Sequence, residues 1–508
     1  MQKKRSVLIC LAMLVTLFIG ASTSATASGD GAQFVSQSVP TSLSPRQIKS
    51  ISVTFLNNGS TTWTKALLYR LGSQNPQDNL TWGIGRVVLA DNASIAPNQQ
   101  VTFTFNITAP ATPGTYNLQW RMLRENVAWF GDFTPNDAVT VAQQVTLCPG
   151  VQVVADGLTD AGPALQQCIN NTASGGTLQI PAAAYGIGTA VNITKPITIR
   201  TSGTAGSTQN CTGAISCATL RARPDLFVFG GFVYVSNTTD VTLDHLIFDG
   251  NRSTRLGSAA AAQCPTQSRY GYNVRVSGCT FCNFLYNLDE NTLCGTSLEW
   301  VGDNAKINDN VFRANGDHSQ TNMWSDGLTL LISNGADVEG NAFTDNSDVA
   351  LILGGSRNGY VATNTITQAT QAAFAAFSLD DFAGTTSGDY TGAIVTQNTI
   401  NCGASNLCDF GMNFGPHAWL STAPNIFGGS VFGNTVSSAK QGINADGAGT
   451  TASPLVLYSN TATGSPASAT FNCGVRSTSN LNIFTGDSVV NPNGDNTPAT
   501  NIAWDNCP

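Results

Sequence analysis

The chain has 508 residues, of which only 11% are charged, and Asp and Glu outnumber Lys and Arg by 31 to 23. This acidic balance, with no basic run interleaved with aromatic residues, argues against nucleic-acid binding. A hydrophobic fraction of 42% together with many Gly, Ser, Thr and Asn residues indicates an ordered all-β chain, not a helical or a disordered one.

The first 27 residues have the pattern of a secretory signal peptide. Three basic residues at 3–5 precede an apolar stretch at 7–20, and Ala25 and Ala27 form a small-x-small cleavage site. The stretch is too short for a membrane anchor, and no later segment is apolar enough to span a membrane. We therefore expect a secreted, extracellular or cell-surface protein, with 20 Lys and Arg against 31 Asp and Glu after cleavage.

An even number of cysteines, twelve, remains after the signal peptide, which in an exported chain indicates disulfides. Short spacing predicts the pairs Cys211–Cys217 and Cys402–Cys408, and Cys473–Cys507 is a further candidate at the C-terminus. Cys279 and Cys282 have the spacing of half a zinc site, but no second half follows, so no metal site is expected. The connectivity stays open within one cluster of four: Cys264, Cys279, Cys282 and Cys294.

Residues 30–146 form the first predicted domain. Residues 51–55, 101–107 and 116–120 alternate between apolar and polar side chains and are separated by Gly-, Asn- and Pro-rich turns. This pattern predicts an Ig-like β-sandwich of two antiparallel sheets.

Four tryptophans mark this domain: Trp63, Trp82, Trp120 and Trp129. With the sequences at 55–59, 69–73 and 129–132, they resemble the four-tryptophan (FW) Ig-like domain first described in the autophagy receptor NBR1. The resemblance implies a binding or spacer role. On physical grounds, four tryptophans in a small sandwich more often pack the core than form a ligand platform.

Residues 148–508 form the second predicted domain. Asp160 precedes a short amphipathic helix with Leu165, Cys168 and Ile169 on one face, which would cover the open end of a stacked sheet. The segment at 156–187 resembles the N-terminal cap of the pectate-lyase-like superfamily. The resemblance implies a right-handed parallel β-helix with a short N-terminal capping helix.

Repeats support this interpretation. An Asn followed by a small and an apolar residue recurs every 23 to 36 residues, which is the length of a β-solenoid coil. We expect short strands that end in these Asn-small-apolar triplets, and a ladder of Asn residues at tight turns whose amides bond to the backbone of the next coil. The ladder residues would be Asn310, Asn341, Asn364, Asn398, Asn434 and, as a weaker copy, Asn460.

Two acidic residues lie one coil apart. Asp326 and Asp348 are 22 residues apart and each opens a strand, so they should stack at about the 4.8 Å strand spacing. Two carboxylates at that distance repel, which raises one pKa, and such a pair suits acid–base cleavage of a glycosidic bond.

The pair resembles the motif of family 28 glycoside hydrolases, an Asn-Thr-Asp-Gly followed one coil later by Asp-Asp. In this chain Ser347 stands where the family places its general acid, and the following coil lacks the family's Gly-His-Gly. His318 and Asp317, just before Asp326, are further catalytic candidates. The candidates for substrate binding are Trp324, Arg357, Asp380 and Asp381.

These features favour a carbohydrate-active protein whose partner is a polysaccharide, cleaved by acid–base chemistry without a cofactor. Two alternatives stay open: a non-catalytic glycan-binding or surface structural protein, and a polysaccharide lyase, which would use Ca²⁺ held by carboxylates. No oligomeric state follows from the sequence.

Overall fold

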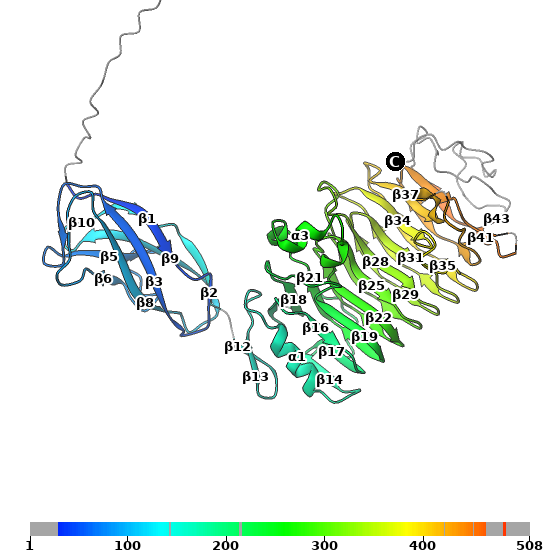
Figure 1. Ribbon diagram of the computed structural model, residues 1–508, viewed down its shortest axis with the longest axis horizontal. Coiled ribbons are helices and arrows are strands. Elements are labelled where there is room, and N and C mark those ends of the chain that lie inside the picture. Colours follow the sequence, from blue (N-terminus) through cyan, green and yellow to red (C-terminus); the bar gives the residue numbers. More distant parts are fainter. Residues whose placement is uncertain are drawn as a thin grey trace, which may run out of the picture. The chain divides into compact units, whose positions relative to one another are not determined.

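The computed structural model describes residues 29–141, 144–212, 216–420, 422–450, 452–463 and 481–483 (Figure 1). The chain divides into two compact units, Met1–Val141 and Ala142–Pro508. The predicted signal peptide and the Cys473–Cys507 pair lie outside the described residues. No helix in the described part is long and apolar enough to cross a membrane.

The first unit is an antiparallel β-sandwich, as predicted from its alternating segments. One sheet has three strands in the order β1 (Ala32–Ser38), β3 (Ile48–Asn57) and β8 (Gln100–Thr108). The second sheet has the order β2 (Ser42–Leu43), β11 (Asp137–Val141), β9 (Gly114–Arg124), β5 (Tyr69–Gln74) and β6 (Arg86–Val88), with β10 (Ala128–Phe133) also paired to β9. A separate pair is formed by β4 (Trp63–Thr64) and β7 (Ser94–Ile95).

The tryptophans of this unit pack its core. Trp63, Trp82 and Trp120 are almost completely buried, and the ring of Trp120 meets Phe105 edge-on. Trp129 is half-buried, and the guanidinium of Arg86 lies over its ring. The structural role expected for the tryptophans therefore holds for at least the three buried ones.

The second unit is a right-handed parallel β-helix of three sheets, which Figure 1 shows as strands stacked in chain order from green to orange. The first sheet contains β14 (Thr177–Ile180), β17 (Ile197–Thr201), β20 (Val241–Asp244), β23 (Asn283–Leu285), β26 (Lys306–Asn308), β29 (Asp337–Glu339), β32 (Tyr360–Ala362), β35 (Ile394–Thr396), β38 (Ser430–Phe432), β41 (Leu455–Tyr458) and β43 (Leu481–Ile483).

The second sheet contains β15 (Ala184–Ile187), β18 (Ala218–Ala222), β21 (Leu246–Asp249), β24 (Leu288–Glu290), β27 (Val311–Arg313), β30 (Ala342–Thr344), β33 (Thr365–Thr367), β36 (Thr399–Asn401), β39 (Thr435–Ser437) and β42 (Thr461–Thr463). The third sheet contains β16 (Val191–Ile193), β19 (Val233–Thr239), β22 (Val274–Thr280), β25 (Gly295–Val301), β28 (Ser325–Ile332), β31 (Val349–Leu353), β34 (Ala373–Leu379), β37 (Cys408–Phe414) and β40 (Gln441–Ala445).

A helix at the start of the stack closes its apolar interior. Helix α1 (Gly162–Asn171) buries Leu165, Cys168 and Ile169, as predicted, against the first coil. Its N-cap residue is Ala161, not Asp160. Asp160 instead accepts hydrogen bonds from the backbone of Gly162 and, at 2.9 Å, of Gly188, so it ties the helix to the first coil.

The Asn ladder is present, with two differences from the prediction. Each Asn lies in the turn just before a strand of the second sheet, so its triplet begins a strand and does not end one, and its amide bonds to a side chain of the next coil and not to its backbone. The amide nitrogen of each Asn donates to the side-chain oxygen of the next at 2.9 Å through all five steps from Asn310 to Asn460. Each is fully buried, so the ladder satisfies amides that would otherwise be costly inside the coil.

Five disulfides cross-link the part of this unit that the structure describes. Cys211–Cys217 and Cys402–Cys408 form as predicted. The open cluster resolves into Cys264–Cys294 and Cys279–Cys282. A fifth bond, Cys148–Cys168, joins α1 to the hairpin of β12 (Gln144–Cys148) and β13 (Val151–Val154).

Short helices occupy two of the loops: α2 (Arg252–Arg255), α3 (Ala259–Gln263) and η1 (Ser268–Tyr270) in one, and η2 (Pro416–Ala418) in the other.

Candidate active site

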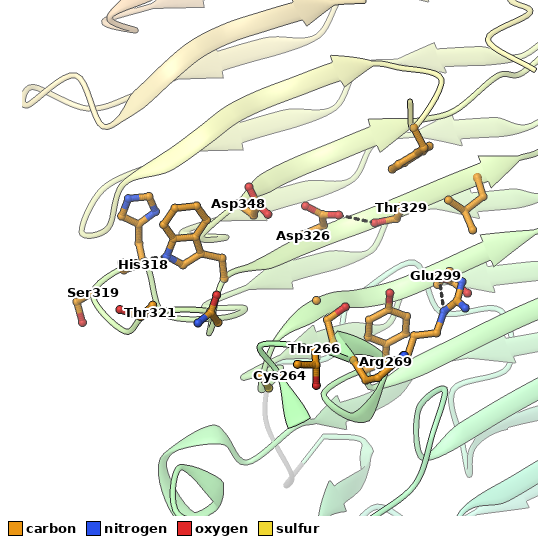
Figure 2. A pocket seen from close by; sticks show the side chains of 18 residues that line it. Cys264, Thr266, Arg269, Glu299, His318, Ser319, Thr321, Asp326, Thr329 and Asp348 are labelled. Carbon is orange, nitrogen blue, oxygen red and sulfur yellow. Dashed lines mark hydrogen bonds and ion pairs between the residues drawn. The ribbon is translucent and has the colours of Figure 1, made fainter. Parts of the chain in front are cut away.

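Two adjoining hollows lie along the third sheet. The larger one, here called the polar cleft, has a volume of about 690 Å³ and is lined by the loop that carries η1 and by strands β25 and β28 (Figure 2). The smaller one, here called the apolar pocket, has a volume of about 300 Å³ and is lined by β31 and the loops after β34 and β37. Asp326, Asp348 and Phe382 line both hollows.

Asp326 is held by three coils. It is the second residue of β28, where its backbone pairs with Thr296 of β25. One carboxylate oxygen accepts the backbone N–H of Val349 at 3.0 Å, and the other lies 2.7 Å from the hydroxyl of Thr329. These contacts fix the carboxyl group at the junction of the two hollows.

Asp348 is offset by one residue from the position stacked on Asp326. Leu328 pairs with Leu351, a coil of 23 residues, whereas Asp348 follows Asp326 by 22. In a continuous strand, this offset would turn the two side chains to opposite faces. Asp348 lies in the bend before β31, so its carboxyl group enters the same hollows (Figure 2).

The two carboxyl groups differ in their acidity. Burial, followed by repulsion from Asp348, raises the pKa of Asp326 well above its usual value, although Thr329 and Val349 hydrogen bonds oppose the change. Burial raises the pKa of Asp348 to about 6, while the charge of His318 acts in the opposite direction. Burial and mutual repulsion therefore favour a state in which the pair shares one proton, with Asp326 holding it more strongly than Asp348.

His318 and Trp324 form one wall of the polar cleft. Their rings stack with centroids 4.7 Å apart, and the indole N–H donates to the backbone oxygen of His318. Nδ1 of His318 lies 3.0 Å from the backbone oxygen of Ser347, which accepts its hydrogen. Trp324 is 43% exposed, so its ring offers a surface on which a sugar ring can stack.

A charged network closes the other side of the polar cleft. Glu299 on β25 is buried and pairs with the guanidinium groups of Arg269 and Arg275. Glu299 pairs in register with Thr329, so this network lies one coil from Asp326. Because the one carboxylate of Glu299 is shared between Arg269 and Arg275, the network keeps one net positive charge, and Arg269 brings a guanidinium group to the lining of the polar cleft.

The apolar pocket differs in chemistry. Besides Asp326 and Asp348, its one acidic group is Asp380, which follows β34 and is 2% exposed. One oxygen of Asp380 accepts the backbone N–H groups of Asp381 and Phe382, and burial raises the pKa of Asp380 to about 6. The other lining residues are apolar or aromatic: Val349, Ile352, Phe382, Ala383, Pro416, Trp419 and Leu420.

Three of the candidates selected from the sequence do not line either hollow of the described chain. Asp317 accepts hydrogen bonds from the backbone and hydroxyl of Ser319 in its own loop. Arg357 is exposed and pairs with Asp389, and Asp381 is buried beside Asp380. The structure thus brings together Asp326, Asp348, His318 and Trp324, with Asp380 in the apolar pocket.

Ser347 is not available for proton transfer. Its hydroxyl is buried, donates to the backbone oxygen of Asn315 at 2.9 Å and accepts the N–H of Ser325 at 3.0 Å. It therefore joins neighbouring coils at the position to which the family 28 resemblance assigns an acid.

Several lining residues escaped the sequence analysis. Glu299 and Thr329 occupy equivalent positions of consecutive coils, so an alignment of the coils would have found them. Trp419 and Leu420 belong to a loop without periodicity, and only their apolar character beside η2 marks them. No group of three or more His, Cys, Asp or Glu side chains in the described residues is arranged to hold a metal ion.

Comparison with known families bears on the first unit. Residues 40–136 match the family model of the Ig-like domain from next to BRCA1 gene. This match confirms the four-tryptophan resemblance. No curated protein matches the chain.

Solved structures resembling the chain share little sequence with it. A tailspike double mutant of E. coli bacteriophage HK620, in complex with a pentasaccharide, has 12% identity and a TM-score of 0.43, over 62% of this chain and 55% of that one. An alginate lyase from Paenibacillus has 11% identity and a TM-score of 0.39, over 64% and 96%. A family 28 exopolygalacturonase from Yersinia enterocolitica has 12% identity and a TM-score of 0.38, over 82% and 92%. The chain thus spans about half of the tailspike.

Proposed function

We propose that this chain is an exported glycosidase that cleaves a polysaccharide in the polar cleft. The observation that carries the proposal is the pair Asp326 and Asp348, which share one hollow yet differ in acidity. A protonated carboxyl beside an ionised one is the arrangement that glycosidic cleavage requires. The five disulfides fit export, and the Ig-like unit would serve as an accessory binding or spacer module.

The chemistry divides between the two acids. The carboxyl of Asp326 donates its proton to the glycosidic oxygen as the bond to the anomeric carbon breaks. The carboxylate of Asp348 either takes a proton from an attacking water or bonds to the anomeric carbon, to be displaced by water afterwards. In both routes one water is consumed, a hydroxyl ends on the anomeric carbon and Asp326 regains a proton.

The positions of Trp324 and His318 support the binding part of this proposal. The exposed face of Trp324 lies beside the acids and would stack against the sugar on one side of the scissile bond. His318 stacks on Trp324, and a positive charge on its ring would favour the ionised form of Asp348.

The test is incubation of the mature protein with plant, algal and bacterial polysaccharides, read by reducing ends and by ultraviolet absorbance of unsaturated sugars. We expect reducing ends without unsaturated products. Asp326→Asn and Asp348→Asn should each lower the rate by at least about 100-fold. Asp337→Asn is the matched control, because Asp337 belongs to the same coil but lies on the first sheet.

The alternatives give different results. Unsaturated products that disappear with a calcium chelator would replace the hydrolase with a lyase. Binding to a polysaccharide without any new reducing ends would indicate a binding protein. Cleavage that survives the double substitution of Asp326 and Asp348 would locate the chemistry elsewhere.

A further inference from the structure

The hollows on the two sides of the carboxyl pair suit different parts of a substrate. The polar cleft carries the side chains of Thr266, Gln267, Arg269 and Asn322, which can exchange hydrogen bonds with sugar hydroxyls. Among the described residues that line the apolar pocket, only Trp419 has a side-chain N–H group. A sugar hydroxyl placed there could donate to a carboxyl group, but its oxygen would lose its bonds to water with few donors to replace them, which costs free energy.

The apolar pocket does offer one hydrogen bond. Oδ1 of Asp380 is taken up by two backbone N–H groups, at 2.7 and 2.6 Å, whereas buried Oδ2 has no partner in the described chain. In mildly acidic solution Asp380 is protonated, since burial raises its pKa to about 6. Because Oδ1 already accepts two hydrogen bonds, the proton of the neutral carboxyl group resides on Oδ2. Oδ2 can then donate a hydrogen bond to an acceptor on a ligand.

The charges of the pocket disfavour an anionic group. Three of its lining residues are acidic, Asp326, Asp348 and Asp380, and none is Lys, Arg or His. A free uronate carboxylate would lose its hydration there without a cation to pair with, and each lining acid that ionises would repel it. The suitable occupant has an apolar body, a hydrogen-bond acceptor and no charge, which describes an ester.

We propose that the apolar pocket binds an ester group carried by the polysaccharide, with its carbonyl oxygen accepting a hydrogen bond from Oδ2 of Asp380. This inference rests on the proposed function, because it places the substituent next to the bond that Asp326 and Asp348 cleave. The substrate class is then an O-acylated or methyl-esterified polysaccharide.

The test compares each polymer with its ester-free form. Acetylated xylan, acetylated glucomannan and methyl-esterified pectin are saponified by mild alkali, and binding to each pair is measured by affinity electrophoresis at about pH 5. We expect at least one polymer to bind about tenfold more tightly in its ester form. A preference for acetyl over methyl esters, or the reverse, distinguishes the two ester types.

Variants assign this preference to the pocket. Asp380→Ala should abolish it, and Asp380→Asn should keep it, because an Asn amide also donates a hydrogen bond. Leu420→Asp should abolish it without disturbing the core, since Leu420 is 43% exposed at the pocket. Leu256→Asp is the matched control, with a similarly exposed Leu that lines neither hollow.

Two results would overturn the inference: no polymer binds better with its esters, or the preference survives both Asp380→Ala and Leu420→Asp. Reducing ends are measured on the same polymers from about pH 5 to about pH 7, because Asp348 becomes the carboxylate only near pH 6 and above. Ester-selective binding without cleavage would contradict the glycosidase and support the pocket. Equal cleavage of a polymer with and without its esters would support the glycosidase and contradict the ester pocket.

Discussion

Removing one rung of the Asn ladder should destabilise the β-helix far more than its single side chain suggests. The amide of Asn364 donates to the backbone oxygen of Val338 and to the side chain of Asn398, at 2.9 Å each. Its oxygen accepts the backbone and side-chain N–H groups of Asn341, at 3.0 and 2.9 Å. All of these groups are buried within the stack.

Asn364→Ala leaves at least two buried donors of Asn341 without their acceptor. A buried donor that loses its partner costs about 1–3 kcal/mol, so we expect a loss of about 4 kcal/mol in the free energy of unfolding. Asn364→Asp keeps an acceptor but loses both donated bonds, so it should not rescue. Asn192→Ala is the control, because the exposed side chain of Asn192 makes no hydrogen bond and its removal should cost under about 0.5 kcal/mol.

The assay is denaturant unfolding followed by far-ultraviolet circular dichroism. The Ig-like unit has its own core and serves as an internal reference whose transition should not move. A loss below about 1 kcal/mol for Asn364→Ala would refute the reasoning, because it would mean that the neighbouring coils do not depend on the amide.

Three further predictions concern the site and its surroundings. Trp324→Ala should raise KM roughly tenfold with a smaller effect on kcat, and Trp324→Phe should restore most of the affinity, since a Phe ring still stacks on a sugar. His318→Gln should move the acidic limb of the pH–rate profile upward, because it removes the charge that lowers the pKa of Asp348; an unchanged limb would contradict this role. Burial raises the pKa of Asp289 to about 7, so the unfolded chain releases this proton first and stability falls as the pH rises from about 4 to about 7. For the unsubstituted chain this decrease in the free energy of unfolding is about 4 kcal/mol between about pH 4 and about pH 7. Asp289→Asn lacks the titrating carboxyl group, so the decrease should disappear in denaturant titrations at these two pH values.

The sequence predicted features that repeat with the coil. A buried amide needs a partner at the same height in the next coil, so the regular spacing of Asn residues identified both the ladder and the fold. The same period predicted that Asp326 and Asp348, about one coil apart in the sequence, lie close together in the structure. The prediction that the Asn triplets end strands was wrong, because strands and turns of about three residues have no distinct hydrophobic pattern.

Features that lie in bends and loops were harder to predict. The one-residue offset of Asp348 depends on a bend whose direction the spacing does not encode. The apolar pocket is built by Trp419 and Leu420, whose loop has no counterpart in neighbouring coils. The Cys148–Cys168 disulfide was not predicted, because it joins the capping helix to a hairpin outside the repeats.

The Asn ladder also bears on how such a protein can change. It sets the rise from one coil to the next at the second sheet, while the loops that build the hollows leave from the ends of the third sheet. The step between coils stays near 4.8 Å whatever the length of those loops. The scaffold can therefore exchange its loops, and with them the polymer it accepts, while the acidic pair keeps its place.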